Sequence, residues 1–251
     1  MINENKSFKE LVKTLESFGY TSGEGKTRIF EDLINYVVYG FCVNKGIPSW
    51  NHTPEQNATF AKMFQLWVLA AQEEIEKSGW CDIPGNLHQS YLYSKTGKGF
   101  LGQFFTPEHV CTLMSATSPL PEDKPVSTVY DCCCGSGRLL LAAFVKACNE
   151  KKRVYCVAKD IDPICVRMTV ANFLMHGVPG EVVWGDGLVP TEGKLCFLTN
   201  EHLNDPTSQL FGIPHCRVVP FEETMQGHQA MSAPAEPAIL QPAEFQQLSL
   251  W

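Results

Sequence analysis

The sequence contains neither a long apolar run nor an excess of basic residues. No stretch approaches the roughly 18 apolar residues that a membrane span requires, and the opening segment MINENKSFKE is too polar for the hydrophobic part of a secretion signal. Lysine and arginine together number 20 against 27 aspartates and glutamates, giving a net charge of -7. A basic surface that would attract nucleic acids is therefore not expected. We expect a cytoplasmic protein with no membrane partner, whose contact with any nucleic acid is local or supplied by another subunit.

Cysteine, in contrast, is abundant. The chain has 11 cysteines, three of them adjacent at Cys132, Cys133 and Cys134. Neighbouring side chains on a strand point to opposite faces, so these three thiols cannot converge on one metal ion. No Cys-x-x-Cys or histidine pair stands at zinc spacing. We therefore expect no metal site, and reduced thiols, because cytoplasmic cysteines normally stay reduced.

The first 80 residues are patterned as helices. Apolar residues recur at helical spacing from Phe8 to Phe18 and again from Phe30 to Phe41. Between these two runs, the segment GYTSGEGKT invites comparison with a phosphate-binding loop, but its glycine spacing does not fit that motif and no buried strand precedes it. We predict that Gly23 to Thr27 form a flexible turn.

A third helix is predicted to open at the segment TPEQ. Thr53 can cap it, Pro54 suits its first position and Gln56 can complete a capping box. Gly79 is the expected end of this helix.

From residue 126 onward, predicted strands and helices alternate. The strands are expected at 126–131, 153–160, 181–184 and 194–199, and the helices at 137–148 and 163–177. This alternation predicts a parallel sheet with helices on its faces. Residues 201–226 show little strand pattern, and the end of the chain is rich in Ala, Pro, Glu and Gln. We therefore divide the chain into a helical N-terminal region (1–95), an α/β region (96–226) and a disordered tail (227–251).

Acidic residues follow three successive strands of the predicted sheet. Asp131 ends the first strand and precedes the turn CGSG, Asp160 ends the second, and Asp186 lies in GDG after the third. In an open parallel sheet, ligands bind beyond the carboxyl ends of the strands. A carboxylate can accept both hydroxyls of a ribose, and free N–H groups at a helix start can meet a polar ligand. The pattern indicates a nucleoside ligand.

The motifs at these strand ends resemble those of a known enzyme family. GQFFTP (102–107), DCCCGSG (131–137), KDIDP (159–163) with NFLMHG (172–177), and GDG (185–187) occur in the order and spacing of adenine-N6 DNA methyltransferases. They look most like the modification subunit of type I restriction systems, over roughly residues 95–200. The resemblance implies a class I (Rossmann-like) methyltransferase core with a helical N-terminal region, incomplete because it stops after the fourth strand.

The resemblance also implies S-adenosylmethionine as cofactor and DNA as partner. By it, Asp131 and the glycine turn surround the methionine end, Asp160 takes the ribose and Asp186 the adenine amino group. The implied cofactor-binding residues are Gln103, Phe104, Phe105, Thr106, Pro107, Asp131, Gly135, Ser136, Gly137, Asp160 and Asp186. Thr106 also has a structural interpretation, as the cap of a helix that begins at Pro107.

The fourth strand departs from the family pattern. Adenine methyltransferases carry an Asn-Pro-Pro-aromatic motif there, which holds the target amino group and stacks on the flipped base. Here the strand leads into LTNEHLNDP, where Asn200 can hold the first position but Glu201, His202 and Leu203 replace the rest. Two hypotheses follow: an adenine methyltransferase with Asn200 as catalytic residue, or a catalytically silent cofactor-binding protein that works in a complex with a specificity subunit or another partner.

The final segment QQLSLW resembles the peptide by which bacterial replication proteins dock on the DNA polymerase sliding clamp. The resemblance implies Gln247 as polar anchor and Leu248, Leu250 and Trp251 as apolar anchors. Such a tether would raise the effective concentration of an acidic protein at DNA. The alternative is that this segment folds back onto its own domain.

Overall fold

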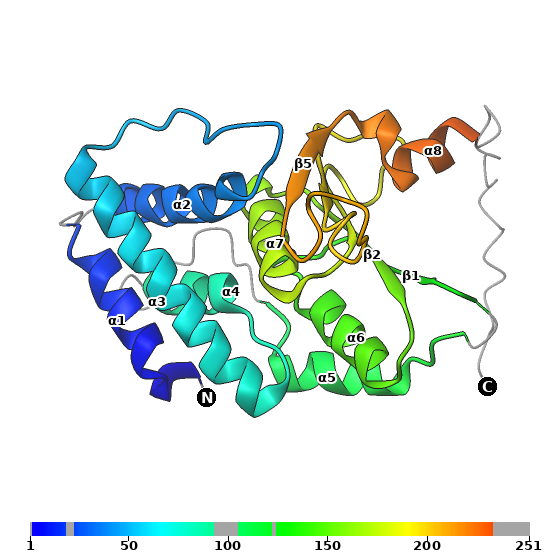
Figure 1. The fold of residues 1–251 in the computed structure, drawn as a ribbon, viewed down its shortest axis with the longest axis horizontal. Helices are drawn as coiled ribbons and strands as arrows, with labels where there is room; N and C mark the ends of the chain where they lie inside the picture. The colour runs from blue at the N-terminus through cyan, green and yellow to red at the C-terminus, as the bar shows by residue number, and fades with distance from the viewer. Residues whose placement is uncertain (1, 19–22, 93–104, 122–123, 233–251) are drawn as a thin grey trace, which may run out of the picture.

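The computed structural model describes residues 2–18, 23–92, 105–121 and 124–232, which form a helical region followed by a five-stranded sheet with its own helices (Figure 1). The helical region comprises η1 (Ile2–Glu4), α1 (Lys6–Glu16), α2 (Gly23–Gly40), α3 (Pro54–Ser78), α4 (Ile83–Leu87) and η2 (His88–Leu92). Within the described ranges, no helix combines the length and apolar character needed to cross a bilayer.

The predicted capping of α3 is confirmed. The Thr53 hydroxyl accepts the Gln56 N–H while the Gln56 side chain accepts the Thr53 N–H, which is a complete capping box. Gly79 ends the helix with a φ of 84°, a left-handed conformation that favours glycine.

The predicted flexible turn at Gly23 to Thr27 is wrong, because α2 already begins at Gly23. The glycines suggested a turn, but the following Ile29, Phe30 and Leu33 are buried and fix the helix in the core. Packing of an apolar face outweighs the modest helix-weakening effect of two glycines in the first turn.

The sheet has the order β1-β2-β3-β4-β5. Its strands are β1 (Ser127–Asp131), β2 (Val154–Asp160), β3 (Gly180–Trp184), β4 (Leu195–Thr199) and β5 (Cys216–Val219). The first three are parallel and are connected by α6 (Arg138–Asn149) and α7 (Pro163–His176), while α5 (Glu108–Thr117) packs beside α6. This β-α-β-α-β arrangement confirms the expected α/β, Rossmann-like class and places the carboxyl ends of β1, β2 and β3 at one edge.

The expectation of an all-parallel sheet is wrong for its last strands. β4 runs antiparallel to β3, and β5, which the sequence did not indicate, runs antiparallel to β4. The connection of residues 185–194 is shorter than the dozen or so residues that a parallel crossover usually needs, so the chain returns beside β3. The segment after α2 covers the outer edge of β5. The Val43 N–H donates to the Cys216 carbonyl at 2.9 Å.

The chain remains ordered past the expected start of the tail. After η3 (Phe221–Glu223), helix α8 runs from Met225 to Ser232, and its first turn is held by the buried Glu181 of β3. The Glu181 carboxylate accepts the backbone N–H groups of Met225 (2.6 Å) and Gln226 (3.0 Å). The predicted disorder is thus wrong for residues 227–232, and the rest of the predicted tail lies outside the described residues.

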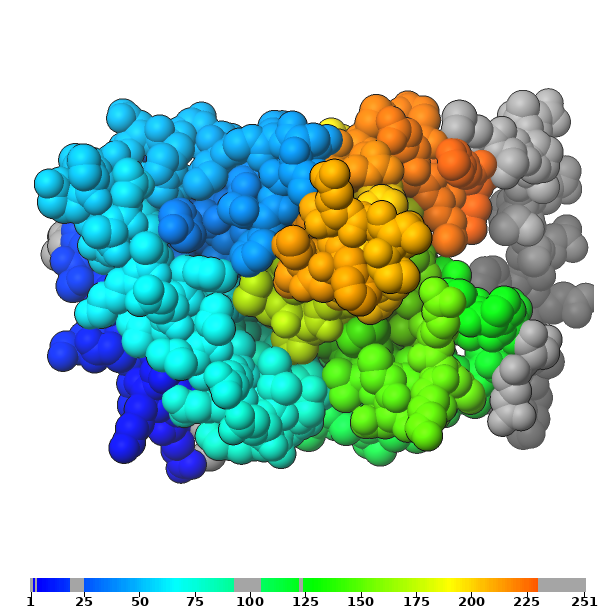
Figure 2. All heavy atoms as spheres, in the orientation of Figure 1, coloured from blue at the N-terminus to red at the C-terminus, as the bar shows by residue number. Residues whose placement is uncertain are grey.

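One hydrophobic core runs through the helical region and the sheet. It includes Phe8 and Trp67 from the helical region together with Phe173 and Phe197 from the α/β region. Helix α2 packs against α7, and on the face shown in Figure 2 the blue to cyan segments meet the green to orange ones along a continuous contact. The helical region is therefore part of the structure that supports the sheet.

Candidate functional site

The glycine turn after β1 is fixed to the end of β2 by a carboxylate. Asp160 Oδ2 accepts the Gly135 N–H at 2.8 Å, and Oδ1 accepts the N–H of Asp162 at 2.9 Å. The Cys134 N–H adds a 3.0 Å bond to the carbonyl of Lys159. Two of the predicted site residues, Gly135 and Asp160, are thereby in direct contact.

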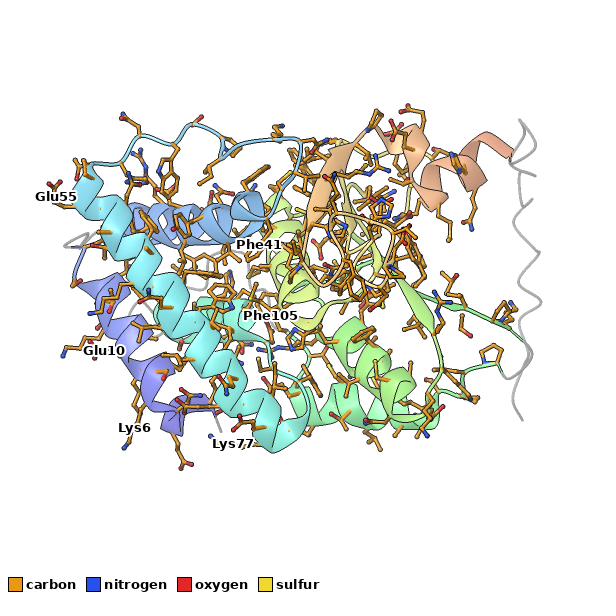
Figure 3. The ribbon with its side chains drawn as sticks, in the orientation of Figure 1. Lys6, Glu10, Phe41, Glu55, Lys77 and Phe105 are labelled. Atoms are coloured by element: carbon orange, nitrogen blue, oxygen red, sulfur yellow. The ribbon has the colours of Figure 1, made fainter. Side chains whose placement is uncertain are left out.

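Two positions of the turn have the left-handed conformation that favours glycine. Gly135 has a φ of 56° and Gly137 a φ of 85°. A Cβ at Gly135 would lie only 3.0 Å from the Phe105 ring, so this ring packs directly on the turn. Phe105, labelled in Figure 3, is 9% exposed and lies in the middle of the molecule, where the helical and α/β regions meet.

The loop after β3 lies against the loop after β1. Its Gly185 N–H donates to the Asp160 carbonyl at 2.9 Å, and a Cβ at Gly187 would stand 2.1 Å from the Cys132 carbonyl oxygen. Asp186 between these glycines is exposed and accepts the Leu188 N–H at 2.9 Å. The three strand-end carboxylates, Asp131, Asp160 and Asp186, thus lie at one edge of the sheet.

Burial governs the electrostatics of this edge. It raises the pKa of Asp131 above its ordinary value, against the opposing effect of a hydrogen bond from the Cys133 N–H. Burial is also the main cause of a raised pKa at Asp160, to which the charge of Asp131 contributes. A carboxylate offers about four lone-pair sites, and the described bonds use one per oxygen, so Asp160 can still accept hydroxyl groups.

A cleft of about 590 Å³ lies at this edge of the sheet, lined by Asp186 but not by Asp131 or Asp160. Its lining includes Ile161 directly after Asp160, Trp184 at the end of β3, Asp186, and Phe221 from η3. The Trp184 indole N–H donates to the Ile161 carbonyl at 3.0 Å, which fixes one wall. The lining also includes the charged residues Glu192, Lys194 and Glu222. Aromatic walls with carboxylates beside them can take a heterocyclic base.

A second cavity, of about 330 Å³, lies beside β1 and contains none of the predicted site residues. Thr128 and Tyr130 of β1, Val157 of β2 and Met225 of α8 contribute to its lining. Among the described residues β1 pairs only with β2, so β1 is an edge strand.

Sequence reasoning missed a buried ionic cluster behind the glycine turn. Asp82, the N-cap of α4, accepts hydrogen bonds from Ser136 and Arg138 at Oδ2 and from Gly85 and Asn172 at Oδ1. Arg138 is the first residue of α6, where the helix dipole disfavours a cation. That position was the one sequence signal for a partner carboxylate.

The three adjacent cysteines differ in environment. Cys134 is buried, with its Sγ 3.4 Å from the Thr169 hydroxyl, whereas Cys133 is exposed and Cys132 is partly buried. Burial raises the pKa of Cys133 and, well above its ordinary value, that of Cys134. Both thiols therefore favour the protonated form, in which cysteine is a poor nucleophile.

The structure does not bring Asn200 to this edge. Because β4 is antiparallel to β3, Asn200 follows the end of β4 that lies opposite the carboxyl ends of β1, β2 and β3. Its Nδ2 donates to the carbonyls of Phe173 and Val178, both at 2.9 Å, and its Oδ1 accepts the His215 N–H at 3.2 Å. The placement expected for a catalytic Asn200 is wrong, and these bonds give the side chain a structural role.

The remaining predicted residues have separate outcomes. Gln103 and Phe104 lie outside the described residues, as do the docking residues Gln247, Leu248, Leu250 and Trp251.

The predicted cap at Thr106 is wrong, because Pro107 is the N-cap of α5 and makes no side-chain capping bond. The Thr106 carbonyl instead accepts from Arg138 Nη1 at 3.3 Å. The Ser136 hydroxyl donates to Asp82 at 2.6 Å, away from the strand-end carboxylates.

Comparison with known proteins finds a family match within this region. Residues 88–196 match the sequence profile of the N-6 DNA methylases, which confirms the family resemblance of the four motifs. A search of curated proteins finds no significant match.

Two solved structures are similar to parts of the chain. One, titled a class I S-adenosylmethionine-dependent methyltransferase from Listeria monocytogenes, is 16% identical with a TM-score of 0.47, over 74% of this chain and 55% of its own. The other, the methyltransferase subunit of a type I restriction-modification system from Streptococcus thermophilus, is 26% identical with a TM-score of 0.35, over 68% of this chain and 36% of its own. The chain thus spans about half of the first structure's length and about a third of the second's.

Proposed function

We propose that this chain, whose residues 88–196 belong to the N-6 DNA methylase family, binds S-adenosylmethionine and is the cofactor-binding unit of an adenine-N6 DNA methyltransferase. The observation that carries this proposal is that Asp131, Asp160 and Asp186 lie at one edge of the sheet, where Asp160 anchors the glycine turn and Asp186 lines the cleft. Parallel sheets bind nucleotide-like ligands at this edge.

The residues of this edge fit the parts of such a cofactor. Asp160 retains acceptor capacity for ribose hydroxyls, since each of its oxygens accepts one described backbone bond. Asp186, exposed at the rim of the cleft, can accept from an adenine amino group. Asp131 ends β1 directly before the glycine turn, where its carboxylate would favour the cationic methionine end of the cofactor. When bound, S-adenosylmethionine supplies an electrophilic methyl group.

Methyl transfer to adenine needs an acceptor that holds the target amino group beside the methyl group. The sequence contains no Asn-Pro pair, and Asn200 is bonded at the opposite end of the sheet. These observations favour a second candidate function, a protein that binds the cofactor without transferring the methyl group and acts in a complex. DNA and a specificity or other subunit are the partners that either function implies. Docking on a sliding clamp stays a prediction from residues 247–251 alone.

Two measurements test these functions. Calorimetry with S-adenosylhomocysteine, the demethylated product, should show binding by the wild-type protein. Adenine-methylation-sensitive digestion of DNA from expressing cells, with and without the chain, then reports transfer. Protection from digestion supports the enzyme, and binding without protection supports the silent subunit. Absence of binding overturns both.

A further inference from the structure

A buried ionic cluster joins the helical region to the glycine turn. Asp82 is 0% exposed and Arg138 is 5% exposed. Asp82 Oδ2 accepts from Arg138 Nε and, at 2.6 Å, from the Ser136 hydroxyl, while Oδ1 accepts from Gly85 N–H at 2.8 Å and Asn172 Nδ2 at 2.7 Å. The donors come from α4, from the turn with α6, and from α7. One carboxylate thus ties together three elements.

The guanidinium of Arg138 extends this joint along a second direction. Its Nη2 donates to Asn86 Oδ1 at 3.0 Å and Gln89 Oε1 at 3.2 Å, both in the α4–η2 segment. Its Nη1 donates to the Thr106 carbonyl at 3.3 Å, and its Cζ lies 5.6 Å from the centroid of the Phe105 ring. All three guanidinium nitrogens are therefore engaged, two of them outside the ion pair.

The Phe105 ring transmits this arrangement to the turn. It packs on Gly135, where an added Cβ would lie 3.0 Å from a ring carbon, and its other neighbours include the His88 ring at 5.2 Å between centroids. Asp160 holds the same glycine by its N–H. Gly135 thus lies between a carboxylate of the sheet and a ring that lies beside the Arg138 guanidinium.

The cluster has no room for adjustment on the α4 side. A Cβ at Gly85 would stand 2.0 Å from Asp82 Oδ2 and 2.7 Å from the Ser136 hydroxyl. A buried ion pair is weak evidence for stability, since apolar residues of the same volume often stabilise as well or better. Its donors come from three elements that meet at the glycine turn, and this location favours a positioning role.

We propose that Arg138, through Asp82 and Phe105, is a positioning residue by which the helical region sets the shape of the glycine turn for the cofactor. The identity of the ligand rests on the proposed function. The link between the helical region and the turn rests on the contacts of Asp82, Arg138 and Phe105 described above. It makes residues 82–89 part of the cofactor site although the sequence places them in a separate region.

Arg138→Lys is the primary test, because lysine keeps the charge beside Asp82 but lacks the fork that reaches Thr106, Asn86 and Gln89. We expect S-adenosylhomocysteine affinity to fall roughly tenfold, by analogy with the loss seen when groups that orient metal ligands are replaced. Hydrogen exchange at the backbone amides of Gly135 to Gly137, measured far below the unfolding midpoint, should accelerate.

Arg167→Lys is the matched control. Arg167 of α7 also pairs with a glutamate of the helical region, Glu31, at 3.5 Å, but is remote from the turn in its contacts. This variant should keep wild-type affinity and wild-type exchange at the turn. Gly85→Ala is a second, independent variant, which should shift Asp82 and Ser136 and reproduce the Arg138→Lys phenotype. It keeps the inference testable if Arg138→Lys does not fold.

The outcomes distinguish failure of the positioning role from failure of the proposed function. A lower unfolding midpoint in Arg138→Lys with unchanged affinity and unchanged exchange at the turn would show a merely structural role and overturn the inference. If wild-type protein binds no S-adenosylhomocysteine, the proposed function fails. The exchange measurement still tests whether Arg138 positions the glycine turn. Faster exchange in Arg138→Lys and Gly85→Ala, but not in Arg167→Lys, supports it, and wild-type exchange in both overturns it.

Discussion

Asp160 has a structural role, and the proposed function gives the same side chain a binding role. Each carboxylate oxygen accepts a backbone N–H, one from Gly135 and one from Asp162, so the residue shapes the glycine turn even without ligand. The remaining lone pairs can accept hydrogen bonds from ribose hydroxyls. Substitution should therefore affect binding directly and also through the turn.

Asp160→Ala is expected to weaken S-adenosylhomocysteine binding by about 1–3 kcal/mol, because the ligand loses acceptors and Gly135 loses its anchor. Isothermal titration calorimetry measures the difference. Asp205→Ala serves as control, since Asp205 bonds to Thr207 within its own turn, at the opposite end of the sheet. Equal affinities of Asp160→Ala and wild type would contradict the assignment.

Asn200 offers the reverse case, a residue whose importance is to stability. Its φ is 54°, a strained conformation for most side chains, and its amide satisfies three buried backbone groups. Asn200→Ala should lower the free energy of unfolding by about 2–4 kcal/mol, and Asn200→Gly by less, because glycine relieves the strain. Urea denaturation ranks the two. An affinity for S-adenosylhomocysteine that fell in Asn200→Gly would refute a purely structural role.

At the scale of elements, the sequence predicts what depends on local pattern. The capping box at Thr53, the stop at Gly79, and the strands and helices from residue 126 to 199 follow from spacing and turn residues, and the structure contains them. The direction of β4 does not follow from its own residues, because the apolar pattern of LCFLT suits a parallel or an antiparallel strand equally. It depends on pairing with β3 and on the length of the preceding loop.

The buried cluster was unpredictable for a related reason. Asp82 and Arg138 are far apart in sequence. A cation at a helix start indicates a partner carboxylate, but nothing in the sequence identifies Asp82 as that partner. Only the tertiary packing of α4 against α7, with Asp82 beside the first residue of α6, makes them partners. The strand-end carboxylates could be predicted, by contrast, because parallel connectivity brings consecutive strand ends together.

The stability of the protein should depend on pH through His176, which links α7 to the helical region at Cys81. Burial lowers the pKa of His176 below its ordinary value of 6.5, and its Nε2 accepts the Cys81 N–H at 3.2 Å, which requires the unprotonated nitrogen. Because the unfolded chain binds the proton more readily, stability should be lost as pH falls below that ordinary value toward the lowered pKa.

The comparison of wild type with His176→Gln isolates this effect. The free energy of unfolding of the wild-type protein, measured by urea denaturation at pH 7.5 and pH 5.5, should fall more steeply than that of the variant. Asp131 and Asp160 have raised pKa values and contribute in the opposite sense at lower pH, equally in both proteins. Identical slopes would exclude His176 as the cause.

At the scale of the whole molecule, the helical region and the sheet share one core, and Asp82 adds an ionic joint to it. A net charge of -7 gives the chain no general attraction to DNA, so a DNA-directed function needs local contacts or a partner. The shared core and the buried ion pair favour a single cooperative unit over the described residues.

A single unfolding transition is the consequence that can be measured. Trp67 of α3 is fully buried in the helical region and Trp184 ends β3 beside the cleft. The chain has 5 tryptophans, so variants that keep only Trp67 or only Trp184 report each region separately. Their urea transitions should coincide with each other and with the loss of far-ultraviolet circular dichroism, because α2 and α7 cannot separate without exposing the shared core. S-adenosylhomocysteine should move both transitions to higher urea by the same amount, since a ligand that binds only the folded state stabilises the entire cooperative unit. A Trp184 transition that responded to the ligand while the Trp67 transition did not would show that the helical region folds independently of the cofactor site.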